Sequence, residues 1–339
     1  MAELTDLPNG RDFTWHDGDR VVRFGREVLA TAPAALEAAG WEGYDLLSTP
    51  RALAGAPTAL ADLAGAVHHV PPGKVADTSA ALFDAVEAPG IVAYGGGRVI
   101  DTAKAIAAVR GGRVAALPTT LSGAEMTAIH RLPAGRTAPR LVRPELVLAD
   151  PDVMTELEEA ALRATAMNAL GHAADALFGP RANPVSTLCG LQGARLIARA
   201  LDQDRDARDR AALALGGLLG ATAIDGAGLS LHHAVCQELV RGLGIPHAEA
   251  NAALLPHTME AMSGREPAAI AALAEAVGSG PDGLCRRLTA LGGGRRRLSE
   301  MGAEAAMLEA PLGSIEARLG AMTEPPGPGE LRELVERAW

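Results

Sequence analysis

The sequence is poor in aromatic side chains and in cysteine, and it has no long apolar run. Aromatic residues make up 3% of the 339 residues and hydrophobic residues 48%, so small aliphatic side chains must build the core. The cysteines are odd in number and form no C-x-x-C pair, which argues against a disulfide framework and for a reducing compartment. No apolar stretch approaches the roughly 20 residues of a membrane-spanning helix. The cysteines are Cys189, Cys236 and Cys285.

Positive charge is scarce as well. Lysine and arginine number 31 against 41 acidic residues, for a formal net charge of −10. The one block of basic residues is Arg295–Arg297, so the basic face of a nucleic-acid-binding protein is missing. The first residues show no basic-then-apolar signal pattern. We therefore expect a cytoplasmic protein that acts on a small molecule, with neither nucleic acid nor membrane as its partner.

Two regions differ in their hydrophobic period. Up to about Asp150, short apolar runs alternate with helical periods, which predicts a doubly wound, mostly parallel, Rossmann-like sheet. Beyond Asp150 only helical periods occur. We predict an α/β dinucleotide-binding domain over residues 1–151 and an all-helical substrate and catalytic domain over residues 152–339. The predicted strands are Arg20–Phe24, Tyr44–Ser48, Val67–Val70, Ile91–Tyr94, Val114–Leu117 and Leu141–Leu148, with helices over Glu27–Ala39, residues 52–66 and Lys74–Ala88.

The stretch Gly90–Lys104, GIVAYGGGRVIDTAK, joins a strand pattern to a helix pattern through three glycines. A helix N-terminus presents free backbone N–H groups to an anion, and glycines let the backbone approach a phosphate closely. The spacing is not the G-x-G-x-x-G dinucleotide fingerprint. Two interpretations therefore stay open: a tight turn without a ligand, and a phosphate-binding loop formed by Gly95, Gly96 and Gly97.

Hydroxyl side chains follow the next strand pattern along the chain. Val114–Leu117 leads directly into the segment Pro118–Thr127, PTTLSGAEMT. Open α/β sheets bind their ligands at the carboxyl ends of the strands. Hydroxyls and a glycine at this place indicate a second part of the same ligand site.

These two blocks, GGGRVIDTAKAIAA and LPTTLSGAEMT, resemble the iron-containing alcohol dehydrogenase superfamily, and its maleylacetate reductase branch in particular. The resemblance continues in family order through MNALGHAADALFGPRANP (Met167–Pro184), LHHAVCQ (Leu231–Gln237) and PHAEANAALLPH (Pro246–His257). It implies a dehydroquinate synthase-like architecture, an NAD or NADP cofactor and a homodimer.

The resemblance also implies which residues touch the cofactor. The three glycines would hold the pyrophosphate, and Thr119, Thr120 and Ser122 would lie near the ribose, the phosphates and the nicotinamide. Arg98 either pairs with a phosphate or faces solvent, and Asp101 belongs to the same motif. Ser48 and Thr49 end the second predicted strand, where the adenine ribose is read. No Asp stands at that turn to hold a 2′-hydroxyl, so NAD and NADP both stay open.

In the superfamily, an Asp and three His hold a divalent metal, and those positions fall here on Asn168, His172, His233 and His247. An amide is a weaker ligand than a carboxylate and cannot offset a divalent charge. Three imidazoles and a water still suit Zn²⁺. In the maleylacetate reductase branch an Asn also stands at this position, and those enzymes are regarded as working without metal. We therefore favour a metal-free site, with Zn or Fe as the alternative.

A second departure from the superfamily is Gln237, which stands where a histidine usually takes part in proton relay. Glutamine does not titrate, so the proton must come from His172, His233, His247 or water. We expect these three histidines and Gln237 to form the catalytic group. Because several imidazoles would be buried together, their pKa values should be lowered.

The expected function is hydride transfer between a nicotinamide and a ketone, enol or alcohol, in the manner of a maleylacetate reductase. The alternatives are a non-redox, NAD-using lyase of the same fold, a metal-dependent alcohol dehydrogenase on another small substrate, and a catalytically silent binding protein. A carboxylated substrate would need cations. The candidates by position are His130, Arg131, Arg181 and Arg241.

Overall fold

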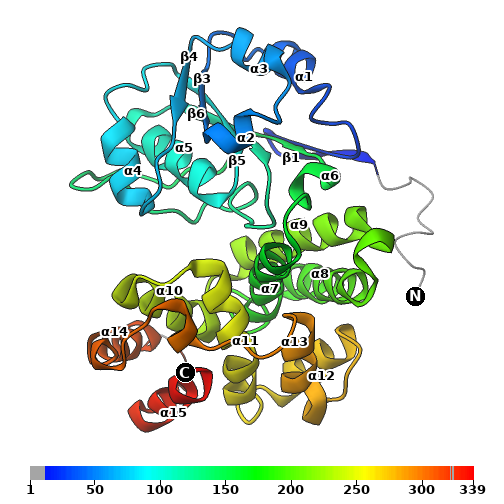
Figure 1. Ribbon diagram of the computed structural model, residues 1–339, viewed down its shortest axis with the longest axis vertical. Helices are drawn as coiled ribbons and strands as arrows, with labels where there is room; N and C mark the ends of the chain where they lie inside the picture. Colours follow the sequence, from blue (N-terminus) through cyan, green and yellow to red (C-terminus); the bar gives the residue numbers. More distant parts are fainter. Residues whose placement is uncertain (1–11, 321, 323) are drawn as a thin grey trace. The chain divides into compact units, whose positions relative to one another are not determined.

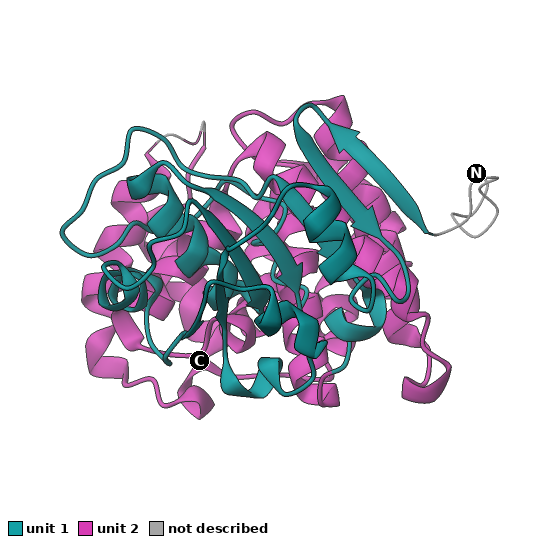
Figure 2. Cartoon of the chain, turned by 90° about the horizontal axis from the view of Figure 1, so that it is seen from above, with its two compact units in different colours: residues 1–156 teal, residues 157–339 magenta. Residues whose placement is uncertain are grey.

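The computed structural model describes residues 12–320, 322 and 324–339. The chain divides into two compact units, residues 1–156 and residues 157–339, which Figure 2 colours teal and magenta. Each unit has its own core and is described by itself.

The first unit contains a mixed, mostly parallel sheet, which confirms the predicted α/β class (Figure 1). Its seven strands run in the order β1-β2-β7-β6-β5-β3-β4. Strand β1 pairs antiparallel with β2, and all the other pairs are parallel. The strands are β1 (Phe13–Asp17), β2 (Arg20–Phe24), β3 (Asp45–Ser48), β4 (Ala66–His69), β5 (Gly90–Gly95), β6 (Arg113–Pro118) and β7 (Leu146–Ala149).

Apolar side chains cover both faces of this sheet, as expected of buried parallel strands. Successive residues of β5 point to opposite faces, so Ile91 and Ala93 belong to one core cluster while Val92 and Tyr94 belong to the other. Helices from both sides complete the two clusters. These helices are α1 (Ala32–Ala38), α2 (Pro50–Leu53), α3 (Thr58–Asp62), α4 (Val75–Leu82), α5 (Gly97–Arg110) and α6 (Pro151–Met154).

The strand order reverses between β3 and β5. The chain leaves β3 outward to β4, returns to β5, and then continues through β6 and β7 on the other side. Such a reversal leaves a crevice at the carboxyl ends of the two strands, where open α/β sheets bind ligands. The turn after Ser48 and the triple glycine after Tyr94 both lie at this end, and Ser48 Oγ donates a hydrogen bond to the Tyr94 carbonyl (2.8 Å).

Several predicted boundaries in this unit were wrong. The strand predicted at Leu141–Leu148 spans only Leu146–Ala149, because Pro144 cannot donate a ladder hydrogen bond. The helix predicted over residues 52–66 is two short helices separated at Gly55 and Pro57. The helix predicted from Glu27 begins at Ala32, since Glu27 has a positive φ of 63°. Strand β1 was not predicted.

The second unit is helical throughout its described residues, as predicted from the helical periods. Local caps fix its helix starts: Asn183 forms a capping box with Ser186 at the start of α8, and Asp209 accepts from Ala212 N at the start of α9. Helix α11 begins at His247, which is one of the predicted site residues. The helices are α7 (Glu159–Asp175), α8 (Pro184–Asp202), α9 (Arg210–Ala227), α10 (Leu231–Leu243), α11 (His247–Met262), α12 (Pro267–Ala276), α13 (Leu284–Leu291), α14 (Glu309–Leu319) and α15 (Pro328–Ala338).

Within the described residues, no single helix is both long and apolar enough to cross a membrane. The pair α9 and α10 reaches that threshold only together, by length and composition, and is bent by 98° at its break.

Candidate functional site

The three glycines lie between β5 and α5, as predicted. Gly95 ends the strand, Gly96 is the N-cap of the helix, and Gly97 is its first residue. No side chain caps the helix and no acidic residue stands in its first turn. Its first N–H groups and the positive end of its dipole are therefore left for an anion.

The hydroxyl segment after β6 packs directly on this loop. Thr119 N donates to the Gly95 carbonyl (3.1 Å). A Cβ added at Gly97 would lie 2.9 Å from Ser122 Cβ, and one added at Gly96 would lie 3.1 Å from Thr120 Cγ2. The protein itself therefore disfavours a larger residue at Gly97 and leaves little room for one at Gly96, in addition to any ligand.

One atom of this segment points to a ligand. The Thr120 hydroxyl oxygen is buried and has no hydrogen-bond partner among the described residues. A buried polar atom normally finds a partner. The uncapped helix end and this hydroxyl together fit the phosphates of a nicotinamide dinucleotide.

A buried lysine ties α5 to the segment beyond the hydroxyls. Lys104 Nζ donates to Asp101 Oδ1 (2.8 Å) and to the carbonyls of Ala124 (2.9 Å) and Ile129 (3.0 Å). Next to Ala124, the fully buried Glu125 has no partner for either carboxylate oxygen among the described residues. Burial raises the pKa of Glu125 to about 7, with Lys104 opposing the shift.

The remaining predicted cofactor contacts differ in their surroundings. Arg98 is exposed, and Asp101 pairs with Lys104 at 2.8 Å. Ser48 is buried and bonded to the Tyr94 carbonyl, while the Thr49 hydroxyl caps α2 by accepting from Ala52 N (3.2 Å). No contact with a cofactor tests these residues, so their role stays a prediction.

In the second unit, α7 and α10 bring histidines together. His172 and His233 lie with their rings 4.8 Å apart and nearly parallel, at 11°, and His232 meets His233 edge-on at 5.0 Å. We call His172, His232 and His233 the histidine cluster. Gly171 makes the approach possible, because a Cβ there would lie 2.8 Å from His232 Nε2.

A buried aspartate at the end of α7 organises the start of α10. Asp175 Oδ1 accepts from His232 N (3.0 Å), and Oδ2 accepts from Ser230 N (2.8 Å), His233 N (3.3 Å) and His233 Nδ1 (3.0 Å). The carboxylate therefore caps the helix and fixes the His233 ring with its Nδ1 proton toward Asp175. The other nitrogen, Nε2, carries the lone pair and is buried without a partner among the described residues.

His232 is engaged at both ring nitrogens. Nδ1 lies 3.0 Å from Thr258 Oγ1, and Nε2 lies 2.8 Å from Asn251 Oδ1. Asn251 in turn donates to the His247 carbonyl (2.8 Å) at the first residue of α11. His232 therefore joins α10 to α11. Neither it nor Asp175 was among the predicted site residues.

Burial lowers the pKa of every ring in the histidine cluster, which is the direction predicted for His172 and His233, whereas His247 is exposed and is not buried with them. Desolvation is the main cause, and neighbouring histidines add to it. The pKa of His232 and that of His233 fall to about 3, and the pKa of His172 lies well below 6.5. Burial raises the pKa of Asp175, while its N–H donors oppose that shift. The three rings are therefore neutral near pH 7.

The other predicted residues lie on the same helices. Asn168 is buried on α7, one turn before His172, and His247 is exposed at the start of α11. Gln237 is half-buried on α10, and its Oε1 accepts from Arg318 Nη2 (2.8 Å). Arg318, from α14, also donates to Glu238 Oε1 (3.0 Å). Sequence reasoning missed Arg318, since it stands 81 positions beyond Gln237 outside the recognised motifs.

Three of the four candidate substrate cations have local contacts instead. His130 is bonded at both ring nitrogens, to the Arg131 carbonyl (2.9 Å) and to Val142 N (3.0 Å). Arg181 donates to the Gly226 and Asp225 carbonyls, and Arg241 pairs with Glu238. Arg131 is exposed.

Known proteins of similar sequence and structure define the family. Residues 20–151 match the iron-containing alcohol dehydrogenases, and residues 162–304 match the C-terminal part of the Fe-containing alcohol dehydrogenase family. The chain is 35% identical over 300 residues to maleylacetate reductase 2 of Cupriavidus pinatubonensis, covering 83% of this chain and 82% of that protein. It is 32% identical over 277 residues to a maleylacetate reductase of Pseudomonas aeruginosa, covering 76% and 77%.

Among solved structures, the maleylacetate reductase of Agrobacterium tumefaciens superposes with a TM-score of 0.83 at 28% identity, covering 97% of this chain and 98% of that one. The chain therefore belongs to the Fe-containing alcohol dehydrogenase family and is a dehydrogenase or reductase. Membership of this family implies a nicotinamide cofactor.

The family name also implies a metal, which the histidines do not fit. Among the described residues, the one group of three His, Cys, Asp or Glu ligand atoms lying within 4.8 Å of one another is elsewhere, at His257, Glu260 and Cys285. The ligand atoms of His172, His233 and His247 do not all lie within that distance of one another. The carboxylate nearest to the histidine cluster, Asp175, is occupied by four N–H donors. The fourth family position is the neutral Asn168, which supplies no charge to a divalent ion.

Proposed function

We propose that the protein is a metal-independent, NAD(P)H-dependent reductase of a ketone or enone carboxylate of the maleylacetate type. One observation carries the proposal: His233 is held by Asp175 through Nδ1 while its Nε2 is buried without a partner in the described residues. An imidazole fixed in this way is positioned to exchange a proton at a single atom, here His233 Nε2.

In this proposal, residues 1–151 bind the dinucleotide and residues 152–339 hold the catalytic group. Gly95, Gly96 and Gly97 receive the pyrophosphate at the start of α5, and the Thr120 hydroxyl completes its hydrogen bonds there. The reduced nicotinamide, when bound, supplies the hydride. The remaining predicted contacts, Ser48, Thr49, Arg98, Asp101, Thr119 and Ser122, belong to the same proposal.

Hydride transfer to a carbonyl or a conjugated carbon leaves negative charge on an oxygen, which needs a proton. His233 is neutral in the free protein because burial lowers its pKa to about 3. A bound carboxylate places a negative charge nearby and raises that pKa again. We propose that His233 then carries a proton on Nε2 and passes it to the substrate, while His172 and His247 complete the polar lining.

The substrate carboxylate needs a cation in the site, and we propose that Arg318 is this cation. Its guanidinium contacts Gln237 Oε1 at 2.8 Å and is close enough to His233 to lower the pKa of that ring. Guanidinium groups bind carboxylates through paired hydrogen bonds. Gln237 would orient Arg318 rather than titrate. The relatives' name, maleylacetate reductase, supports a dicarboxylate as the substrate.

Kinetics of an Arg318→Gln variant test this assignment. We expect KM for maleylacetate to rise at least about tenfold with the NADH affinity unchanged, because a charged hydrogen bond contributes about 1.5–3 kcal/mol. An Arg241→Gln variant is the matched control, since Arg241 pairs with the same Glu238 and should leave KM nearly unchanged. Equal effects in the two variants would contradict the role of Arg318.

Two further elements of the proposal have their own measurements. Substituting Asn168→Asp supplies the carboxylate that the metal-dependent relatives use, so zinc or iron should bind more tightly in the variant than in the natural chain. The homodimer predicted from the family resemblance is tested by the mass of the protein in solution, measured by light scattering.

A further inference from the structure

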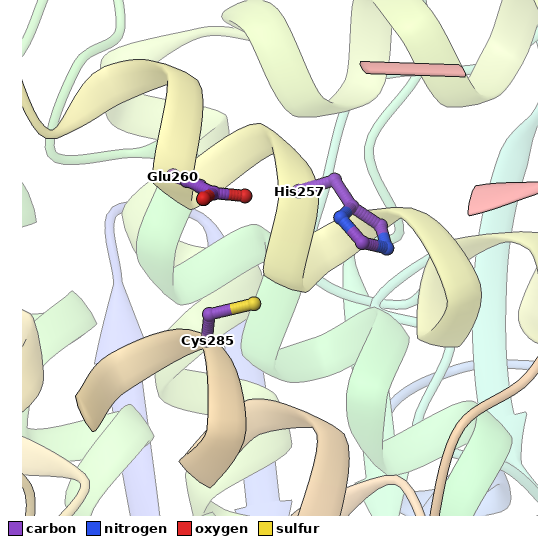
Figure 3. A group of neighbouring side chains, drawn as sticks. All are labelled: His257, Glu260 and Cys285. Carbon is purple, nitrogen blue, oxygen red and sulfur yellow. The ribbon is translucent and has the colours of Figure 1, made fainter. Parts of the chain in front are cut away.

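A second group of metal-binding side chains lies in the helical unit, outside the histidine cluster. His257 and Glu260 stand on α11 and Cys285 on α13 (Figure 3). His257 is ten residues beyond His247 on the same helix, about 15 Å away by helical rise. His257 is the last residue of the motif Pro246–His257, but the family resemblance implies no role for it, and the proposed reaction uses none of the three residues.

The three side chains converge. Figure 3 shows the Glu260 carboxylate and the Cys285 sulfur directed toward the side of His257, and one ligand atom from each lies within 4.8 Å of the other two. His257 and Glu260 are three residues apart, which places both on one face of α11. Ligand atoms of a tetrahedral zinc ion lie about 3.5 Å apart, as its bond lengths of about 2.0–2.3 Å require. Small side-chain rotations therefore close the group around an ion.

Two details of the group suit a metal ion. His257 Nδ1 is buried and has no hydrogen-bond partner among the described residues. Arg337 binds one Glu260 oxygen, Oε2, at 2.9 Å, which leaves the other oxygen for a ligand bond. An outer hydrogen bond of this kind orients a carboxylate ligand.

The neighbouring pocket does not suggest a different ligand. It has a volume of about 400 Å³ and is lined by charged side chains. Its arginines are already paired, Arg265 with Glu330 at 2.6 Å and Arg337 with Glu333 at 2.6 Å and with Glu260. An anion would have to break these pairs, whereas a cation beside His257 meets an available Glu260 oxygen and the Cys285 thiol.

We propose that His257 Nδ1, Glu260 and Cys285 Sγ bind one Zn²⁺ ion, with water as the fourth ligand. Nitrogen, oxygen and sulfur donors together favour zinc over the harder calcium and magnesium ions. The ion would join α11 to α13 and so stabilise the packing of the helical unit. Since it lies apart from the histidine cluster, its role is structural, and the reaction does not depend on it.

The experiment uses the full chain, kept reduced, stripped with a chelator and titrated with Zn²⁺ against a chromophoric chelator, and separately with Co²⁺. We expect one equivalent of each ion to bind and Co²⁺ to give a thiolate-to-metal charge-transfer band. In Cys285→Ser that band should disappear and the zinc affinity should fall by about 10–100-fold or more. Cys189→Ser is the matched control, because Cys189 is half-buried on α8 outside the group and should change neither measurement.

Glu260→Gln is a second variant, at an exposed side chain where the fold should be kept. It should weaken zinc binding without removing the cobalt band, since the thiolate stays in place. His172→Ala in the histidine cluster should leave both the band and the affinity unchanged. The proposal is overturned if the band survives in Cys285→Ser, if it disappears in His172→Ala, or if the stripped natural chain binds no zinc.

Discussion

Replacing Glu125 by glutamine should change how the stability of the protein depends on pH. The Glu125 side chain is fully buried, and burial raises its pKa from 4.5 to about 7. The folded protein therefore holds this proton more tightly than the unfolded chain does. Between pH 4.5 and about 7 the unfolded chain has lost the proton and the folded protein has kept it, so folding stability falls as the pH rises through that window.

The size of the effect follows from the shift. A difference of 2.5 pKa units, from 4.5 to 7, corresponds to about 3 kcal/mol at 1.36 kcal/mol for each unit. Glutamine has nearly the same shape and does not titrate. Relative to Glu125→Gln, the free energy of unfolding of the natural protein should therefore fall by about 3 kcal/mol between pH 4.5 and pH 7 and should not fall further above pH 7.

The assay is urea denaturation of both proteins at several pH values from about 4 to 8, comparing the difference in unfolding free energy between them at each pH. Taking the difference removes the titration of every other group, including the histidine cluster. Glu145→Gln is the control, because Glu145 is exposed and its substitution should leave the curve unchanged. A difference between natural protein and Glu125→Gln that stays constant with pH would refute the reasoning, since it would mean that Glu125 is ionised in the fold throughout.

The other predictions concern the two parts of the site. Gly97→Ala should abolish NADH binding in calorimetry. It should also cost about 1–3 kcal/mol of stability, because the new Cβ lies 2.9 Å from Ser122 Cβ. Adding Ser122→Gly should restore the stability but not the binding, and Ser122→Gly alone is the control. His233→Ala should lower kcat by about 10²–10⁴-fold and Gln237→Ala by much less; the reverse order in steady-state kinetics would exclude His233 as the proton donor. Burial lowers the pKa of His232 from 6.5 to about 3, so its neutral ring stabilises the fold above pH 6.5. Up to about 5 kcal/mol of that contribution is lost as the pH falls toward 3. The urea midpoint of His232→Gln should therefore change less on acidification than that of the natural protein.

The parts of the fold that the sequence predicted are those with strong local patterns. The glycine turn between Tyr94 and Val99 could be placed because a strand period, three glycines and a helix period are consecutive. The short strand β7 and the divided helix α2–α3 were placed wrongly, because an apolar run of a few residues does not show where tertiary pairing begins or ends.

Residues of the candidate site were predicted only where they belong to a recognised family motif. His172 and His233 followed from the family resemblance, and their lowered pKa values followed from burial. Asp175 was missed although it stands three residues after His172, since a carboxylate in an amphipathic helix usually faces solvent. Arg318 was missed because α14 approaches α10 through tertiary packing, which leaves no pattern in the sequence.

The central claim is a nicotinamide-dependent reduction without a metal at the histidines. The most direct measurement is maleylacetate-dependent oxidation of NADH or NADPH by chelator-stripped protein. The zinc and iron contents are determined on the same sample. Both measurements are repeated on Cys285→Ser, which lacks one ligand of the zinc site proposed at His257, Glu260 and Cys285. The account predicts that the stripped protein and the Cys285→Ser variant both keep their turnover. Loss of turnover on stripping, with recovery on adding zinc or iron to Cys285→Ser, would contradict it and would assign the metal to Asn168, His172, His233 and His247.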